Sequence, residues 1–177
     1  MSVDTNDRLT IVVTTNKVPA VGRLRKEIQQ TKPFGSLEEE AYLGLLRTAD
    51  TLLRGMVAVL KPAGLSPAQY NVLRILRGAG DRGLACGEVG ERMITRDSDI
   101  TRLLDRLEVR RLIARGRDRA DRRVITTRIT SEGLQALKRL DAATQEFPKR
   151  RMGHLGAERL RSLTRLLDLL RQPEDGE

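Results

Sequence analysis

The chain of 177 residues contains one cysteine, one histidine and no tryptophan, and aromatic residues make up only 2% of it. A single cysteine, Cys86, excludes an internal disulfide and a cysteine-cluster metal site, and it favours a reducing cytoplasm. A single histidine, His154, leaves little material for a zinc site or a histidine-based catalytic pair. The sequence therefore disfavours most familiar hydrolytic enzymes, and we predict no catalytic residue, metal or cofactor.

Long apolar runs are also missing. The longest aliphatic run near the N-terminus is Ile11–Val13, and the residues before it include Asp4 and Asp7. This pattern lacks the basic flank and the apolar length of a secretion signal, and no segment predicts a membrane span. Because 39% of the residues are apolar but few are aromatic, aliphatic helix faces must form most of the core.

The charge is strongly positive. Lysine and arginine number 33 against 24 acidic residues, which gives a formal net charge of +9. Residues 85–130 hold 12 basic residues, and every one is an arginine. The guanidinium fork suits phosphates and guanine edges, so this choice points to nucleic acid. A high-GC coding bias would also replace lysine with arginine, and the two explanations stay open at this point.

Helix signals recur along most of the chain. Ser36 with Glu39 and Ser66 with Gln69 are capping-box pairs, and apolar residues follow each pair at helical spacing. Pro67 occupies the first helical position after Ser66. The predicted helices cover about 37–60, 66–78, 86–93, 97–110, 131–152 and 157–172.

A hairpin is expected between the fourth and fifth of these helices. β-Prone runs begin at Ile113 and cover 124–129, and the polar stretch 118–123 between them predicts a hairpin tip. The two helices before the hairpin, the second rich in exposed arginine and threonine, are typical of a helix-turn-helix. The predicted fold class is mainly α: a winged helix-turn-helix with a two-stranded β wing and long N- and C-terminal dimerisation helices.

The chain divides into four predicted segments. Residues 1–35, with the β-prone run Leu9–Thr15, form an N-terminal arm that we expect to dock on the dimer, since 35 residues cannot build a core of their own. Residues 36–65 form a dimerisation helix, residues 66–130 the winged lobe that binds DNA, and residues 131–177 the C-terminal dimerisation helices.

Three stretches carry a resemblance to a known family. Residues 100–108 read ITRLLDRLE, residues 118–123 read DRADRR, and residues 129–133 read ITSEG. With their spacing, these stretches resemble the multiple antibiotic resistance regulator (MarR) family of winged-helix transcription factors over about residues 36–171. The resemblance implies a cytoplasmic homodimer that binds a palindromic operator in double-stranded DNA, as a repressor. It also implies release by a small molecule or an oxidant, as in many members. Residues 96–99 are more acidic than the family's usual helix start.

Candidate DNA contacts lie on the second helix of the helix-turn-helix. We expect Ser98, Asp99 and Thr101 to lie against base edges, with Arg102 and Arg106 on bases or phosphates. In the alternative, Arg102 pairs with Asp99 or Asp105 and Arg106 pairs with Asp105 on a solvated face. Asp97 is expected to cap the helix through its carboxylate, and a position beside cytosine amino groups is the alternative.

The wing supplies a second set of candidates. Arg119, Arg122 and Arg123 are expected in the minor groove or on phosphates, and Asp118 and Asp121 are expected to hold the arginines and the turn. Alternatively, all five are ordinary turn-flanking polar residues.

Further expectations concern the helices outside the hairpin. Leu160, Leu163, Leu167 and Leu170 repeat at helical spacing and predict a dimerisation seam, because a helix this short needs a partner surface. Members of the family often bind a ligand between the dimerisation helices and the DNA-binding lobe, and two of the few aromatic residues fall in those segments. We therefore expect a pocket for a small aromatic ligand near four residues. These residues are Tyr42, Leu46, Tyr70 and Leu73, although both tyrosines would also suit an ordinary core.

Two functions of other classes compete with DNA binding. Residues 78–83 match G-x-G-x-x-G, which would suit a nucleotide-binding enzyme, but the match follows a predicted helix where a dinucleotide site needs a strand. A helical interaction module with a basic surface is the other alternative. Cys86 is expected to be a packing residue rather than a redox sensor, and His154 neither a ligand nor a catalyst.

Overall fold

The computed structural model describes residues 22–95, 99–117 and 124–172. Internal contacts divide the chain into two units, Met1–Ala49 and Asp50–Glu177, and the division falls inside a helix, α2 (Leu37–Leu60). The β-prone run at 9–15 lies outside the described residues. The four predicted segments and the docking of the arm therefore stay predictions.

In the first unit, a short helix α1 (Arg23–Glu27) occupies a stretch for which no helix was predicted. The following helix α2 begins where the capping signal placed it, because Ser36 Oγ accepts a hydrogen bond from the Glu39 amide at 3.2 Å. The Glu39 carboxylate binds the Gly35 amide at 2.6 Å instead of completing the box at Ser36. Three acidic residues in the first turn of α2 also interact favourably with the positive end of the helix dipole.

The second unit continues α2 and contains all the strands of the described chain. Helix α3 starts at Pro67 with both hydrogen bonds of the Ser66–Gln69 capping box in place. The predicted helices 86–93 and 131–152 correspond to α4 and α6. The elements after α2 are α3 (Pro67–Ala79), β1 (Leu84–Ala85), α4 (Cys86–Glu91), α5 (Ile100–Val109), β2 (Ile113–Arg117), β3 (Ile125–Ile129), α6 (Ser131–Met152) and α7 (Gly156–Leu170).

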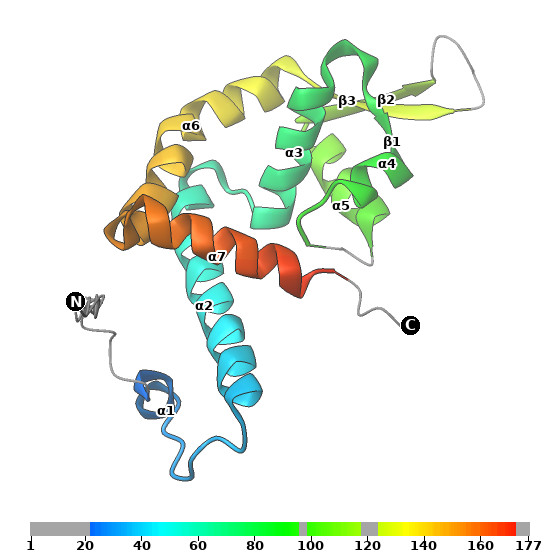
Figure 1. Cartoon of the computed structure of the whole chain (residues 1–177). Coiled ribbons are helices and arrows are strands. Elements are labelled where there is room, and N and C mark those ends of the chain that lie inside the picture. The colour runs from blue at the N-terminus through cyan, green and yellow to red at the C-terminus, as the bar shows by residue number, and fades with distance from the viewer. Residues whose placement is uncertain (1–21, 96–98, 118–123, 173–177) are drawn as a thin grey trace, which may run out of the picture. The chain divides into compact units, whose positions relative to one another are not determined.

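The sheet contains the predicted two-stranded wing and one further strand. Strands β2 and β3 form the expected antiparallel hairpin, with Arg115 opposite Thr127, and they project together from the helices (Figure 1). A third strand, β1, pairs with the other edge of β3, so the sheet has three strands in the order β1-β3-β2. The sequence did not predict β1, because a strand of two residues is too short to show an alternating pattern.

Helix α3 forms the centre of the second unit and contacts α4, α5, α6 and β3 (Figure 1). Its residues Val72, Leu73 and Leu76 have no exposed surface. Leu104 and Leu107 of α5 belong to the same buried cluster. Each such side chain contributes about 1.5–3 kcal/mol when fully buried. As predicted, aliphatic residues form nearly all of this core.

The start of α6 is packed closely against the end of the helix-turn-helix. Thr130 caps α6 by accepting a hydrogen bond from the Gly133 amide at 3.1 Å, and its hydroxyl donates to the Arg111 carbonyl at 2.7 Å. A Cβ atom added to Gly133 would overlap the Leu112 carbonyl oxygen and lie 2.7 Å from Ile129 Cγ1. The first turn of α6 therefore needs glycine at this position.

Replacing Gly133 with alanine should lower the free energy of unfolding by about 1–3 kcal/mol, because backbone atoms must move apart. Chemical denaturation measures this change. Gly87→Ala in α4 is the matched control, since nothing lies within 4 Å of its added Cβ. That substitution should leave stability unchanged or raise it by up to about 1 kcal/mol. Equal stability of the Gly133 variant and the wild type would contradict this description of the packing.

Candidate nucleic-acid interface

Helices α4 and α5 and the turn between them form the expected helix-turn-helix. The turn is held to α3 because Asn71 Oδ1 accepts a hydrogen bond from the Ile94 amide at 2.9 Å. Helix α5 begins at Ile100, later than the expected start near Asp97, and its N-cap is Asp99, whose carboxylate accepts from the Arg102 amide at 3.2 Å. Asp97 and Ser98 lie outside the described residues. The capping role expected of Asp97 is thus performed by Asp99.

The apolar residues and the candidate DNA-binding residues lie on opposite faces of α5. Leu103, Leu104 and Leu107 are buried, whereas Thr101, Arg102 and Arg106 are exposed. The Arg102 guanidinium lies 3.5 Å from the Asp99 carboxylate, yet its side chain is 74% exposed. Arg106 forms no ion pair with another described residue. Burial of the apolar face therefore presents two arginines and a threonine to the solvent.

The alternative pairing scheme holds for one arginine only. Arg102 pairs with Asp99, as that scheme proposed, but Asp105 pairs with neither Arg102 nor Arg106. The partner of Asp105 is Arg115 in β2, with 2.6 Å between Nη1 and Oδ1. Arg115 was not predicted from the sequence. The available signal was the alternation of strand faces. Arg115 comes two residues after the buried Ile113 and so lies on the same face of β2, which turns toward α5.

The wing arginines that were predicted to bind DNA, Arg119, Arg122 and Arg123, lie outside the described residues, as do Asp118 and Asp121. The described part of the wing adds Arg117, which is exposed at the end of β2 and faces Ile125 across the hairpin. Arg117 was not predicted from the sequence. It extends the exposed basic residues from α5 onto the wing.

The N-terminus of α4 is held by a carboxylate. Glu88 accepts a hydrogen bond from the Ala85 amide at 2.9 Å and lies 2.8 Å from an Arg82 nitrogen. The hydrogen bond from Ala85, with smaller effects of Arg82 and Arg92, lowers the pKa of Glu88 below its usual value. Glu88 therefore stays ionised at neutral pH and stabilises the start of the helix-turn-helix.

The glycine-rich stretch 78–83 is a connection and not a dinucleotide-binding turn. It starts in the last two residues of α3 and leads to β1, the reverse of the strand-then-helix order that such a site needs. Gly83 has φ of 67°, and a Cβ there would lie 2.8 Å from the Thr127 carbonyl oxygen. The glycine thus lets the chain pass close to β3 as β1 begins.

Cys86 and His154 lie in different surroundings. Cys86 is half-buried, with Sγ 4.0 Å from Thr101 Oγ1, and His154 is exposed in a 3₁₀ turn after α6. No group of three or more potential metal ligands occurs among the described residues. No helix within the described ranges is long and apolar enough to cross a membrane.

The four residues of the predicted ligand pocket have different environments. Tyr70 and Leu73 are buried in the core of the second unit, where the Tyr70 hydroxyl donates to Thr144 Oγ1 at 2.9 Å. Tyr42 and Leu46, which belong to the first unit, are 62% and 49% exposed. Tyr70 is thus the ordinary core residue that the sequence analysis offered as an alternative.

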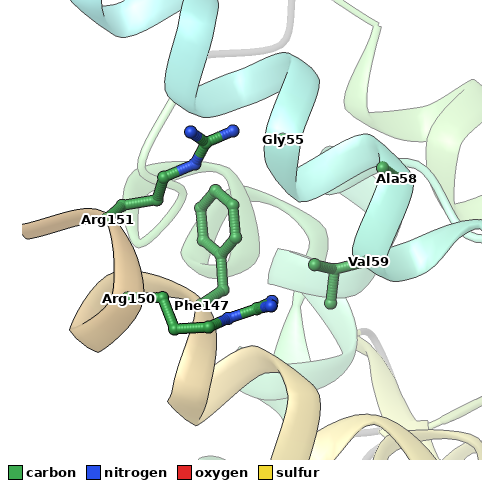
Figure 2. Close-up of a pocket in the computed structure, with 6 residues that line it drawn as sticks. All are labelled: Gly55, Ala58, Val59, Phe147, Arg150 and Arg151. Carbon is green, nitrogen blue, oxygen red and sulfur yellow. The ribbon is translucent and has the colours of Figure 1, made fainter.

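A cavity of about 460 Å³ lies elsewhere, between the second half of α2 and the end of α6. Figure 2 shows the Phe147 ring pointing from α6 toward α2, with the Arg150 and Arg151 side chains on either side of it in this view. The Arg151 guanidinium lies 5.8 Å from the ring centre. Neither arginine forms an ion pair with a described residue. The lining residues are Gly55, Ala58, Val59, Phe147, Arg150 and Arg151.

Helix α7 presents an unusually apolar surface. Leu170 is 66% exposed, and the neighbouring Leu166 and Leu169 are 63% and 61% exposed. The other leucines of the predicted seam, Leu160, Leu163 and Leu167, are partly exposed, and no residue of α7 is buried. The helix therefore leaves more apolar surface in water than the seam alone predicted.

Known proteins resemble the chain in sequence and in structure. A sequence model described as "MarR family" matches residues 63–124. The transcriptional repressor MdtR of Bacillus subtilis is 35% identical over 102 residues, which are 58% of this chain and 64% of MdtR, slightly less than two thirds of its length. The crystal structure of a MarR transcription factor from Planctomyces limnophilus is 39% identical, with a TM-score of 0.58, and the match covers 77% of this chain and 99% of that one.

A further relative has been solved with ligands. CouR of Rhodococcus jostii RHA1, bound to p-coumaroyl-CoA, is 25% identical with a TM-score of 0.67, and the match covers 81% of this chain and 100% of that one. CouR bound to a 23-mer DNA duplex is 26% identical with a TM-score of 0.68, and the match covers 80% of this chain and 99% of that one.

Proposed function

Because the chain belongs to the MarR family of winged-helix transcriptional regulators, we propose that it is a repressor that binds an inverted repeat in duplex DNA as a homodimer. Its relatives are helix-turn-helix repressors and regulators, and the chain is a DNA-binding transcriptional regulator. One observation carries the proposal for its interface: the exposed Thr101, Arg102 and Arg106 face of α5 beside the basic hairpin β2–β3.

The proposal assigns separate roles to α5 and the wing. Helix α5 lies in the major groove, where Arg102 and Arg106 bind guanine edges or phosphates, as guanidinium forks do. Ser98, Asp99 and Thr101 lie near base edges at the start of the helix, where Asp99 also caps α5. The wing contacts the minor groove and its phosphates through Arg119, Arg122 and Arg123, with Asp118 and Asp121 in support.

Replacing Arg106 with alanine should weaken binding to the preferred duplex by about 1–3 kcal/mol and relax base selectivity at one position of each half-site. Fluorescence anisotropy with the preferred duplex and its single-base variants measures both effects. Arg139→Ala on α6 is the matched control, because it removes the same charge from another exposed site. Identical losses in the two variants would show that Arg106 contributes only net charge.

Dimerisation through α7 forms the second part of the proposal. Three leucines of one helix that are each more than 60% exposed, Leu166, Leu169 and Leu170, are typical of a surface that another protein covers. Family members bind palindromes as dimers, and a two-fold symmetric protein matches a two-fold symmetric site. A second copy of the chain is therefore the proposed partner.

The wild type should sediment as a dimer at micromolar concentration, and Leu166→Asp with Leu170→Asp should raise the dissociation constant at least about tenfold. Each buried leucine contributes about 1.5–3 kcal/mol, which a carboxylate forfeits. Ile94→Asp is the control, since Ile94 is 85% exposed but lies in the helix-turn-helix. A folded wild-type monomer under these conditions would rule out the proposed dimer.

Control by a small molecule is the third part of the proposal. Leu73 and Tyr70 are enclosed in the core, so the cavity between α2 and α6 is the better candidate for a ligand site. Phe147 is only 7% exposed but forms part of the apolar wall of the cavity, and two exposed guanidinium groups at the cavity offer charge, which together suit a small aromatic acid. The CouR structure with p-coumaroyl-CoA supports ligand binding in a related protein.

A panel of small aromatic acids should include compounds that raise the melting temperature of the wild type. The increase should fall by at least half in Arg150→Gln with Arg151→Gln, which removes the proposed partners of the carboxylate. Arg161→Gln with Arg165→Gln, two exposed residues of α7, is the control. An unchanged increase in the α6 variant would place the ligand elsewhere, and no increase with any acid would remove the support for this site.

A further inference from the structure

One arginine joins the recognition helix to the wing. Arg115 of β2 places Nη1 2.6 Å from Asp105 Oδ1 and 3.6 Å from Glu108 Oε2, and its Nη2 donates to the Thr101 carbonyl at 3.3 Å. Its backbone amide donates to Glu108 Oε1 at 3.1 Å. The side chain is only 24% exposed, although both carboxylates remain more accessible. Arg115 thus contacts three residues of α5 that span two helical turns.

These contacts determine geometry more than stability. A single exposed ion pair contributes little to folding, because water solvates both charges well. A planar guanidinium with several fixed acceptors, however, accepts only a narrow range of orientations. Arg115 also lies opposite Thr127 in the hairpin register, so a fixed Arg115 holds both strands of the wing relative to α5.

The position of the contact matters because the hairpin continues beyond it. From Arg115, strand β2 runs on to Arg117, and β3 starts at Ile125 on the other strand. The direction in which the rest of the wing extends from α5 therefore depends on the contact between Arg115 and α5. Binding by α5 and the wing on one half-site requires their separation to match the separation of the two grooves.

We propose that Arg115 is a positioning residue for DNA recognition, which sets the wing at the angle that lets α5 and the wing bind one half-site together. This inference rests on the proposed function and adds a residue that acts through protein contacts and not through DNA. A wing held at the required angle binds as soon as α5 is docked, because its local concentration near the DNA is already high. When the wing is not held at this angle, the local concentration falls, and the affinity for the preferred duplex should fall more than the affinity for other sequences.

Asp105→Asn tests the proposal, because a net-charge effect and a positioning effect would change the affinity for DNA in opposite directions. Removal of a negative charge beside the DNA-binding face should tighten binding if only the net charge matters. If Arg115 positions the wing, the same substitution should weaken binding to the preferred duplex, by roughly tenfold for coupling energies of contacting residues. Affinity for a mixed-sequence duplex should change much less. Fluorescence anisotropy on both duplexes gives the ratio.

Two further variants separate positioning from direct contact. Arg115→Lys keeps the charge but loses the fork, and it should weaken selective binding as Asp105→Asn does. Arg115→Ala should leave the slope of log affinity against log salt unchanged, whereas loss of a phosphate contact in each chain of a dimer would make it shallower by roughly 2. Melting temperatures of all variants verify that the lobe is folded.

Asp141→Asn is the matched control for Asp105→Asn. Asp141 of α6 pairs with Arg77 of α3 at 2.9 Å, so the same chemical change breaks an ion pair away from α5 and the wing. It should leave the ratio of the two affinities unchanged. A ratio that falls equally in both variants would show a general loss of structure and would overturn the role of Arg115.

Tighter or unchanged selective binding by Asp105→Asn would also overturn the inference, as would a shallower salt slope for Arg115→Ala, which would make Arg115 a phosphate contact. These outcomes leave the proposed function intact, because the wild type still selects its duplex. Failure of the wild type to prefer any duplex would instead refute the proposed function, and the inference with it.

Discussion

The burial of one face of α5 against α3 is the constraint from which the DNA-binding surface follows. Leu104 and Leu107 are almost fully buried in the cluster that contains Leu73 and Leu76. In a helix, residues three and four positions apart share a face, so fixing these leucines inside directs Arg102 and Arg106 outward. The core and the candidate recognition surface are therefore two consequences of a single packing arrangement.

Arginine has two uses in this lobe, and the composition alone does not separate them. Arg110 donates to the Ala63 and Gly64 carbonyls at 3.0 and 2.8 Å, and Arg128 donates to the Asp81 carbonyl at 2.8 Å. These side chains join the helix-turn-helix and the sheet to neighbouring turns. Arg106 and Arg117, by contrast, extend into solvent. The excess of arginine between residues 85 and 130 therefore reflects structural hydrogen bonds as well as the expected contacts with DNA.

The sequence predicted most of the fold because its signals were local. The Ser66 capping box marked the start of α3, and the predicted helix at 131–152 is α6. The quoted motifs also indicated the family that the comparisons confirm. Strand β1 was missed because it depends on pairing with β3, a contact between distant parts of the chain. The ion pair of Arg115 was missed for the same reason, since the proximity of β2 to α5 arises only in the folded lobe.

Selection of bound sequences from random duplex DNA by the wild-type protein tests most directly the claim that α5 and the wing of two chains read DNA together. The account predicts enrichment of an inverted repeat whose half-site centres lie about one helical turn, roughly 10 base pairs, apart. Enrichment of a single asymmetric site, or no enrichment at all, would contradict it.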